Sequence, residues 1–295
     1  MAIKDVVRSL ILHYLPESWK RRLKSAQLRR RGARLRAHPA VTEEEFRVFA
    51  SGRLGIQPGS LVFVHSSVDL LHFAFSPLRL LQILQDLVGP EGTLAFPSFP
   101  VEGTHEALRA GRVFDVRRTP GGTGLLGELG RRTKGARRSL HPIRSVAAIG
   151  PMAERLVAHH HESPFPFSKS SPFALHAASG GLVVGLGVST KNLTLVHVLD
   201  DAHPESLPTS PYIPELFRAP CRDTEGRETV VPTYAHDQRK MRFDVPRFVR
   251  RHFDRSVAED VRWRGMDFFR VDAGPFVDGL VRLSERGITI YRDKP

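Results

Sequence analysis

A histidine and a carboxylate stand three residues apart in the segment Thr194-Leu-Val-His197-Val-Leu-Asp200. On a helix, this spacing places both side chains and the Thr194 hydroxyl on one side. A histidine ordinarily titrates near neutral pH, and an adjacent carboxylate can hold its ring in one tautomer and stabilise the imidazolium. The segment therefore predicts an acid–base site with His197 as the base. The alternative is a helix-capping threonine and an ordinary His–Asp pair on a solvated face.

An apolar, glycine-rich run, residues 180–188, precedes this segment. Its short, β-branched composition is typical of a strand buried on both faces. The polar residues 189–192 end that strand, and Asn192 or Thr194 can cap a following helix. Open α/β sheets bind their ligands where a strand ends and a helix begins. The expected position of His197 therefore suits a functional site.

The rest of the chain predicts an α/β protein. Residues 61–64, 78–88 and 92–97 have the patterns of a strand, a helix and a strand, which implies a right-handed crossover and a largely parallel sheet. We expect three α-β-α layers around a central sheet that is mostly parallel or mixed. Further strands are expected at 145–149, 182–188, 229–231, 268–271 and 288–291, and further helices at 151–159, 194–201, 245–253 and 275–285. A capping-box signature at Thr42 marks the start of a single domain, 41–295.

Composition limits the class of protein. The chain has 295 residues, of which 41% are apolar and 25% charged, and no uncharged apolar run reaches the roughly 18 residues of a membrane span. Its lone cysteine, Cys221, excludes an internal disulfide, and its first residues lack the pattern of a secretory signal. We expect a cytoplasmic protein.

The net charge of +13 is concentrated at the N-terminus, where residues 1–40 hold 11 Lys or Arg against two acidic residues. Apolar residues recur there at helical spacing, so we predict a basic amphipathic helical extension. It can pack on the body or on a second subunit in a homo-oligomer, which we favour, or attach peripherally to the inner face of a membrane. A nucleic-acid partner is the least favoured, because no nucleic-acid module is recognisable.

Two motifs resemble known binding sites but lack the required context. Gly122-Thr-Gly124-Leu-Leu-Gly127 matches the dinucleotide fingerprint, yet no apolar strand precedes it and no acidic residue follows at the expected distance. The adjacent histidines 159–161 cannot all turn toward one metal, and a solvated or helix-dipole role is favoured for them. We predict neither a nicotinamide or flavin cofactor nor a metal.

Three further polar clusters interrupt apolar stretches: His65-Ser66-Ser67, Pro97-Ser98, and the segment from Arg138 to Ser145. Hydroxyls at strand ends and amides at helix starts can form a cradle for an anion or for a pantetheine chain. Arg138 can pair with a phosphate.

These clusters and the opening segment, in this order along the chain, resemble the aminoglycoside 3-N-acetyltransferase family, which is unrelated to the GNAT fold. The matching motifs are Val64-His65-Ser66-Ser67, Gly92-Thr93-Leu94, Pro97-Ser98, Phe114-Asp115, Thr119-Pro120, Gly124 to Glu128, Arg138 to Ser145, Ala147 to Gly150, Ser171-Pro172, and Thr194, His197 and Asp200. The resemblance covers residues 42–205 well and the remainder loosely.

The resemblance implies a CoA-dependent N-acetyltransferase that moves an acetyl group from acetyl-CoA to a primary amine of a sugar-like acceptor. His197 would deprotonate the amine, Asp200 would orient His197, and a group near Thr194 would meet the oxyanion. No metal is required. The residues expected at the coenzyme are His65, Ser66, Ser67, Ser98, Arg138, Ser139 and Ser145, and those expected at the acceptor are Asp201, Glu128 and His141.

The chain departs from the family in ways that affect the acceptor. Asp200 stands where the family usually has Glu, and Asp201 could take its place. Arginines crowd residues 112–138, which favours an anionic acceptor, such as a nucleotide-linked or lipid-linked amino sugar, over a polycationic aminoglycoside. Those arginines could instead serve the phosphates of coenzyme A. The alternative to an enzyme is a binding or assembly protein that keeps the fold without activity.

Overall fold

The computed structural model describes residues 32, 35, 37–101, 105–241 and 243–291. The predicted basic extension, residues 1–40, therefore lies almost wholly outside the described residues. The strands are β1 Leu61–Ser66, β2 Thr93–Pro97, β3 Phe114–Asp115, β4 Arg137–Arg138, β5 Val146–Ile149, β6 Leu182–Leu186, β7 Phe217–Arg222, β8 Glu228–Thr233, β9 Ala258–Trp263 and β10 Met266–Asp272.

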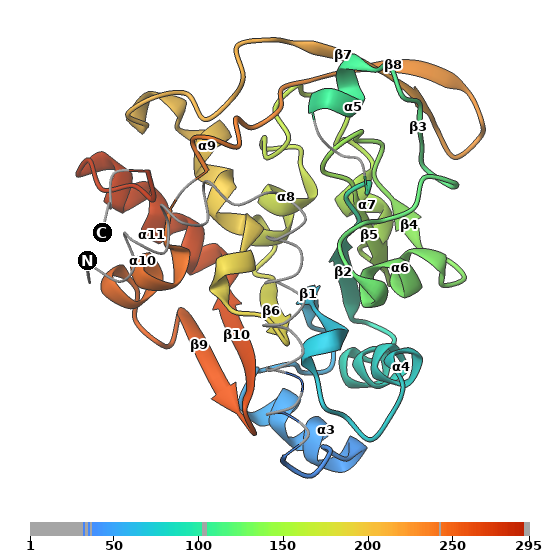
Figure 1. Ribbon diagram of the computed structural model, residues 1–295, viewed down its shortest axis with the longest axis vertical. Coiled ribbons are helices and arrows are strands. Elements are labelled where there is room, and N and C mark those ends of the chain that lie inside the picture. The colour runs from blue at the N-terminus through green and yellow to red at the C-terminus, as the bar shows by residue number, and fades with distance from the viewer. Residues whose placement is uncertain (1–31, 33–34, 36, 102–104, 242, 292–295) are drawn as a thin grey trace.

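Helices connect these strands and flank them (Figure 1). The α-helices are α3 Glu43–Gly52, α4 Pro77–Val88, α5 His105–Arg109, α6 Leu125–Arg132, α7 Ala153–Val157, α8 Pro172–Ala178, α9 Val198–Ala202, α10 Val245–His252 and α11 Ala273–Glu285. The 3₁₀ helices are η1 Val68–Leu70, η2 Thr190–Asn192, η3 Thr194–His197 and η4 Pro204–Ser206. No helix among the described residues has both the length and the apolar character needed to cross a membrane.

The large sheet has seven strands in the order β4-β5-β2-β1-β6-β10-β9. Only its centre is parallel, because β1 runs parallel to β2 and β6, whereas the outer pairings are antiparallel. The expected α/β fold with a mixed sheet is confirmed, but the expectation of a largely parallel sheet is wrong. The strands at both edges pair antiparallel with their neighbours. The parallel arrangement expected from the crossover at 61–97 therefore holds only for the middle of the sheet.

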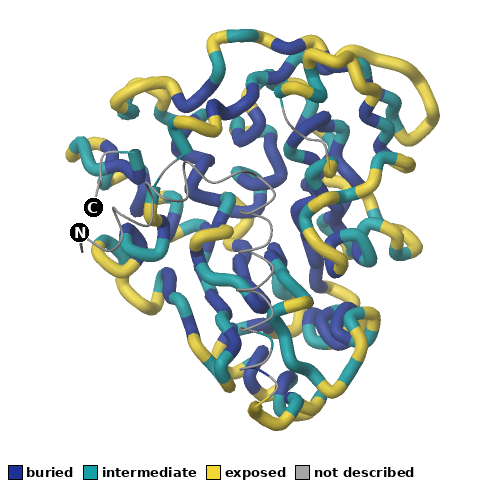
Figure 2. Tube along the Cα trace, viewed as in Figure 1, coloured by how far each residue is buried: buried dark blue, intermediate teal, exposed yellow. Residues whose placement is uncertain are grey.

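Both faces of this sheet are covered by helices. On β1, Val62 and Val64 face one apolar cluster, shared with α3, α4 and α6, and Phe63 faces the other, shared with α7 to α11. This alternation is the period of two of a strand. Figure 2 shows the buried positions gathered along the strands, with exposed positions on the outer loops and on the β7–β8 hairpin. A smaller sheet, β3-β7-β8, lies at that outer end (Figure 1).

Most of the predicted elements are present. The capping box at Thr42 is confirmed, since its hydroxyl accepts from the Glu45 backbone and the Glu45 carboxylate accepts from the Thr42 backbone. The strand expected at 288–291 is wrong. After α11 the chain folds back, with the Ile288 N–H donating to the Leu283 carbonyl, and it continues as a turn up to Tyr291.

Candidate active site

The segment after β6 positions His197 in the buried interior. Gly187, with φ of 75°, lets the chain turn where a Cβ atom would meet the Ser67 carbonyl at 2.5 Å. The predicted helix 194–201 is split into the 3₁₀ helix η3 and the α-helix α9. In a 3₁₀ helix, residues three apart lie directly above one another, so Thr194 and His197 share one side.

Asp200 lies at the centre of the site and is almost fully buried, at 1% exposure. One carboxylate oxygen, Oδ2, accepts three hydrogen bonds: from His197 Nδ1 at 2.8 Å, from His236 Nε2 at 3.2 Å and from the Tyr291 hydroxyl at 2.7 Å. The other oxygen, Oδ1, is buried without a partner among the described residues. All three hydrogen bonds of the network therefore end on one oxygen atom, Asp200 Oδ2.

The His197 ring is held on several sides. It is 9% exposed and contacts the rings of Phe167, His236 and Phe243, with centroid distances of 5.3, 4.7 and 5.8 Å. Because Nδ1 is committed to Asp200, Nε2 is the nitrogen left to meet a substrate. The contacts found for His197 within the described part of the chain do not engage Nε2.

The charge of the cluster is set by burial and hydrogen bonding. Burial alone would raise the pKa of Asp200, but the charge and the hydrogen bonds of His197 and His236 bring this pKa below its usual value. Burial lowers the pKa of His236 to about 3 and raises that of Tyr291, so both are neutral donors near pH 7. The cluster thus contains one carboxylate and no permanent cation.

Asp201 does not contact His197. Its carboxylate accepts from the Phe167 backbone N–H at 2.7 Å and from the Tyr212 hydroxyl at 2.6 Å. Burial raises the pKa of Asp201 to about 7. Between the two aspartates considered from the sequence, Asp200 is the one whose geometry can orient His197. Asp201 is tied to the loop around Phe167 instead of facing an acceptor.

His65, at the end of β1, lies next to the same site. Its Nε2 is 3.4 Å from the Thr194 hydroxyl oxygen, across 129 residues of sequence. Burial, and then the proximity of His176, lower the pKa of His65 to about 3, so its ring is neutral. The end of β1 and the start of η3 therefore meet.

The hydroxyls expected at the coenzyme have different surroundings. Ser66 and Ser67 are partly exposed at the end of β1, next to Thr194 through His65. Ser98 is 1% exposed, and its Oγ has no hydrogen-bond partner in the described chain. Ser66 and Ser67 keep the accessibility that contact with a pantetheine chain requires.

Within the segment from Arg138 to Ser145, the residues Ser139, His141 and Ser145 are internal, contrary to the expectation that they touch coenzyme or acceptor. Ser139, His141 and Ser145 have no exposed surface. Ser139 Oγ accepts from Val146 N, His141 Nδ1 accepts from the Arg144 backbone N–H, and Ser145 Oγ donates to the Ser98 carbonyl. These groups satisfy buried backbone atoms and have no surface left for a ligand. Their motif identifies a structural segment.

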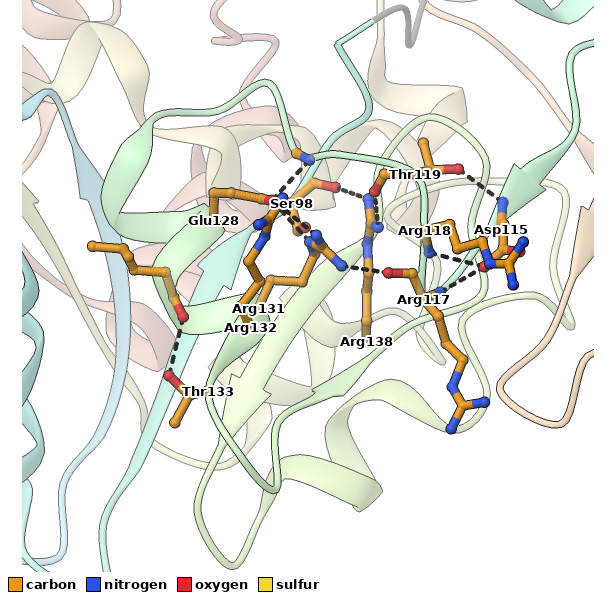
Figure 3. A network of polar contacts seen from close by, with 12 residues as sticks. Ser98, Asp115, Arg117, Arg118, Thr119, Glu128, Arg131, Arg132, Thr133 and Arg138 are labelled. Carbon is orange, nitrogen blue, oxygen red and sulfur yellow. Dashed lines mark hydrogen bonds and ion pairs between the residues drawn. The ribbon is translucent and has the colours of Figure 1, made fainter.

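Arg138 and Glu128 are likewise engaged within the protein (Figure 3). Arg138 donates to the carbonyls of Ser98, Thr119 and Val116 and to Ser145 Oγ. Glu128 accepts from Arg131, from Arg132 and from the Gly121 backbone N–H, and these bonds, chiefly those from Arg131, lower its pKa to about 2. The structure gives Glu128 a role in binding arginines in place of the expected role in binding an acceptor.

Two residues of the Asp200 network, His236 and Tyr291, were not identified from the sequence. They are 36 and 91 residues from Asp200 in the chain. His236 follows β8 as an isolated histidine, and Tyr291 lies in the segment mispredicted as a strand. No spacing rule connects such distant positions, so only the folded chain reveals them.

The nitrogens and the carboxylate of His197, Asp200 and His236 also lie close enough to hold a metal ion, within 4.8 Å of one another. His197 Nδ1 and His236 Nε2 donate protons to Asp200 in the hydrogen-bonded arrangement, whereas metal binding would require their lone pairs. The same atoms can therefore serve either a metal or proton transfer, but not both at once.

Comparison with known proteins shows a consistent set of relatives. The family model described as "Aminoglycoside 3-N-acetyltransferase" matches residues 63–284. Aminoglycoside N(3)-acetyltransferase III of Acinetobacter baumannii is 32% identical over 176 residues, which cover 54% of this chain and 58% of that protein. The chain thus spans somewhat over half the length of the curated relatives that it matches.

Solved structures share the fold. The structure of AAC-VIa bound to sisomicin is similar with a TM-score of 0.66 and 26% identity, and the match covers 84% of this chain and 99% of that chain. The binary structure of AAC-IIIb with CoASH has a TM-score of 0.64 and 22% identity, over 87% of this chain and 100% of that chain. The overall fold is therefore shared with these solved structures.

Proposed function

This chain belongs to the aminoglycoside 3-N-acetyltransferase family, as its motifs predicted, and on that premise we propose that it is an acetyl-CoA-dependent N-acetyltransferase. It transfers the acetyl group to a primary amine of an amino sugar or a sugar-like acceptor. The observation that carries the proposal is the hydrogen bond of 2.8 Å between His197 Nδ1 and Asp200, which leaves Nε2 for the amine.

His197 acts as the general base in this proposal. An amine is mostly protonated near neutral pH and cannot attack in that form, so it first loses one proton to the solvent. As the nitrogen of the neutral amine bonds to the thioester carbon, His197 Nε2 takes a second proton from it. The carbon–sulfur bond then breaks, and the departing thiolate takes the proton from the imidazolium and leaves as coenzyme A. Asp200 stabilises the imidazolium in between, because the donors His236 and Tyr291 leave its negative charge uncancelled.

Thr194 and the neighbouring backbone are proposed to meet the negative charge that develops on the carbonyl oxygen. The Thr194 hydroxyl lies on the same side of η3 as His197 and 3.4 Å from His65 Nε2. A neutral His65 can donate to the Thr194 oxygen, which holds the hydroxyl in position and leaves its O–H free for the carbonyl oxygen. Ser66 and Ser67 are proposed to contact the pantetheine chain.

The proposed acceptor is an amine on a sugar, and two observations bear on its charge. AAC-VIa, which is 26% identical, is bound to sisomicin, and this favours an aminoglycoside. The inward orientation of Asp200 and Asp201 favours a less cationic acceptor, because neither carboxylate presents its charge to a polycation. A catalytically inactive binding or assembly protein is the competing function. It would have no need of the complete hydrogen-bond network on Asp200.

The test is a thiol-release assay with acetyl-CoA and a panel of amines that contains sisomicin and nucleotide-linked amino sugars, run with and without a chelator. We expect turnover with at least one amine, independent of the chelator, and a loss on the order of 10³-fold in kcat for His197→Ala. Absence of turnover with every amine, together with no rise of Tm on adding coenzyme A, would favour the inactive binding protein. Full activity of His197→Ala would exclude the mechanism even if the activity were real.

A further inference from the structure

A groove lined by arginines lies at the β4 edge of the large sheet, on the side of the molecule away from α9 (Figure 1). Its volume is about 1100 Å³. Six of its arginines come from one stretch of chain: Arg117, Arg118, Arg131, Arg132, Arg137 and Arg138. We call it the arginine groove. It is large enough for a nucleotide-sized ligand, since small-molecule sites commonly occupy about 300–1000 Å³.

Arg138 supplies a buried positive charge to this groove, at 7% exposure. Its guanidinium donates to the carbonyls of Ser98 at 2.7 Å and Thr119 at 2.5 Å and stacks over the Phe114 ring. Carbonyl oxygens satisfy its hydrogen bonds without cancelling its charge. Burial, and next the positive charge of Arg131, lower the pKa of Arg138 to about 9. A buried cation of this kind is stabilised by an anion bound nearby.

The outer arginines keep donors available. Arg132 and Arg137 each use only Nε on a carboxylate, with bonds of 2.7 Å to Glu128 and to Glu154. Within the described chain, no other side-chain contact of either is found, so their terminal NH₂ groups point outward unused. Both are more than half exposed, at 67% and 53%.

Arg117 and Arg118 are held in place by hydrogen bonds of their backbone. Asp115 Oδ1 accepts from both of their backbone N–H groups at 2.9 Å, which shapes the loop after β3. Figure 3 shows the dashed contacts of Arg117 leaving from its main chain, while its guanidinium ends without one. For neither side chain is a partner found among the residues that the structure describes. Two guanidiniums are thus presented without a counter-charge.

The charges of the groove do not balance. Its seven arginines, counting Arg227 of the β7–β8 hairpin, face three carboxylates within the lining, Glu154, Asp223 and Glu225, and two beside it, Glu128 and Asp115. The planar guanidinium fork matches the oxygens of a phosphate and binds them in pairs. From this surplus, the buried Arg138 and the unused donors, we propose that the arginine groove binds a diphosphate group carried by a nucleotide-type ligand.

The groove is set apart from the proposed reaction centre. Strand β4 is four places from β6 in the sheet order, and strands lie about 4.8 Å apart, so the lateral separation is roughly 19 Å. A diphosphate held there anchors the far end of an elongated ligand and takes no part in proton transfer. Two substrates of the proposed function carry such a group: the 3′-phospho-ADP end of acetyl-CoA and a nucleotide-linked amino sugar.

Binding is tested first, without any turnover, by calorimetric titration of the full chain with ADP, pyrophosphate and adenosine. The variant is Arg117→Glu with Arg118→Glu, which breaks no ion pair found in the structure. The matched control is Arg250→Glu with Arg255→Glu. It makes the same change of net charge on two exposed arginines at and just after α10, on the opposite side of the molecule (Figure 1).

We expect ADP and pyrophosphate, but not adenosine, to bind the unaltered chain. The groove variant should weaken both by at least about tenfold, and the control should change them by less than about twofold. No measurable binding, or equal weakening in the two variants, would overturn the proposal. Because this assay needs no acetyl transfer, its outcome is independent of whether the proposed function holds.

Steady-state kinetics then identify the source of the diphosphate, and this step rests on the proposed function. If the groove variant raises the KM of acetyl-CoA but not that of acetyl-pantetheine, which lacks the nucleotide, the groove holds the coenzyme. If it raises the KM of a nucleotide-linked amino sugar while both thioesters are unaffected, the groove holds the acceptor. Either result supports the site. Unchanged values for all three substrates would contradict it.

Discussion

Two carboxylates of this protein each accept at least three hydrogen bonds, yet their surroundings differ in charge. Asp200 accepts from two imidazoles and a phenol and is fully buried. Glu128 accepts from the guanidiniums of Arg131 and Arg132 and from a backbone N–H, at the margin of the arginine groove. The pKa of each lies below its usual value.

The charge of the donors, more than their number, decides what each carboxylate can do. Permanent cations cancel the charge of Glu128, so it neither gains nor loses a proton near neutral pH. The donors to Asp200 are titratable or neutral, and its charge remains available to stabilise a proton arriving on His197. Glu128 therefore suits the assembly of a basic surface, and Asp200 suits acid–base chemistry.

The largest expected effect is a loss of kcat on changing Asp200 that does not occur on changing Glu128. Asp200→Asn should lower kcat on the order of 10³-fold, because the imidazolium loses its counter-charge and the new amide NH₂ has no buried acceptor where Oδ1 stood. The measurement is kcat in the thiol-release assay, with Tm to show that the variant is folded. Glu128→Gln, the matched control, should keep kcat within about twofold. Equal losses in both variants would remove the distinction.

A smaller effect is expected from the phenol on Asp200. Tyr291→Phe removes one donor, and we expect kcat/KM to fall about tenfold, the size of one hydrogen bond to a charged group. The acidic limb of kcat/KM against pH should also move to higher pH, because a less stabilised carboxylate holds the imidazolium proton more tightly.

The control for the phenol is Tyr212→Phe, which removes a phenol from Asp201 instead. It should leave the pH profile in place. If Tyr291→Phe changed stability alone, with an unshifted profile, Tyr291 would be a structural residue and not a positioning residue.

Asp201 offers a test of how burial alone acts on a carboxylate. Its pKa is raised from 3.8 to about 7, so the folded state favours the protonated form. The stability that this contributes is complete below about pH 4 and is lost as pH rises through about 7. A pKa difference of about three corresponds to about 4 kcal/mol, so Asp201→Asn should gain on the order of 4 kcal/mol relative to the unaltered chain over that range.

The measurement for Asp201 is the urea midpoint of both proteins across this pH range. A constant difference between them at every pH would show that folding does not raise the pKa of Asp201.

The smallest effect is expected for the stability contributed by Glu128. Glu128→Gln should cost about 1 to 2 kcal/mol, chiefly through the loss of the pair with Arg131, which is only 8% exposed. The pair with Arg132 is mostly exposed and screened by water and salt, so it contributes little. The pKa of Glu128 is lowered to about 2, so its contribution is present above about pH 4.5 and is lost as pH falls toward 2. Urea midpoints at neutral and acidic pH, in low and high salt, measure it. A loss that is independent of both pH and salt would mean that packing, not charge, is responsible.

Local patterns in the sequence identified a large part of the fold. The apolar runs of β1, β2 and β6 and the amphipathic helices α4 and α11 depend on neighbours within one element. Strand β10 of the β9–β10 hairpin was predicted, but β9 was not. The two-residue turn of this hairpin consists of Arg264 and Gly265, both at positive φ, and an arginine is unusual at such a position. The directions of the outer strands were also mispredicted, since pairing across a sheet is not a local property.

The contact between His197 and Asp200 was predictable for the same reason that β1 was. His197 and Asp200 are three residues apart, and any helical backbone brings them together. The motif from Arg138 to Ser145 was equally visible, but its residues Ser139, His141 and Ser145 were expected to contact ligands and are buried instead. Its residue types do not reveal whether a hydroxyl or guanidinium faces a ligand or a buried carbonyl, as the bonds of Ser145 and Arg138 to the Ser98 carbonyl show.

By itself, the sequence determined the family, the central strands and the His197–Asp200 pair, because each depends on residue types at short or ordered spacing. Only the tertiary structure decided that Asp200 and not Asp201 contacts His197, and that His236 and Tyr291 complete the network. It also decided that seven arginines line one groove. The physical reason is that hydrogen bonding, burial and electrostatic surplus depend on distances in space, and residues 36 or 91 positions apart come within 3.2 Å only after the chain has folded.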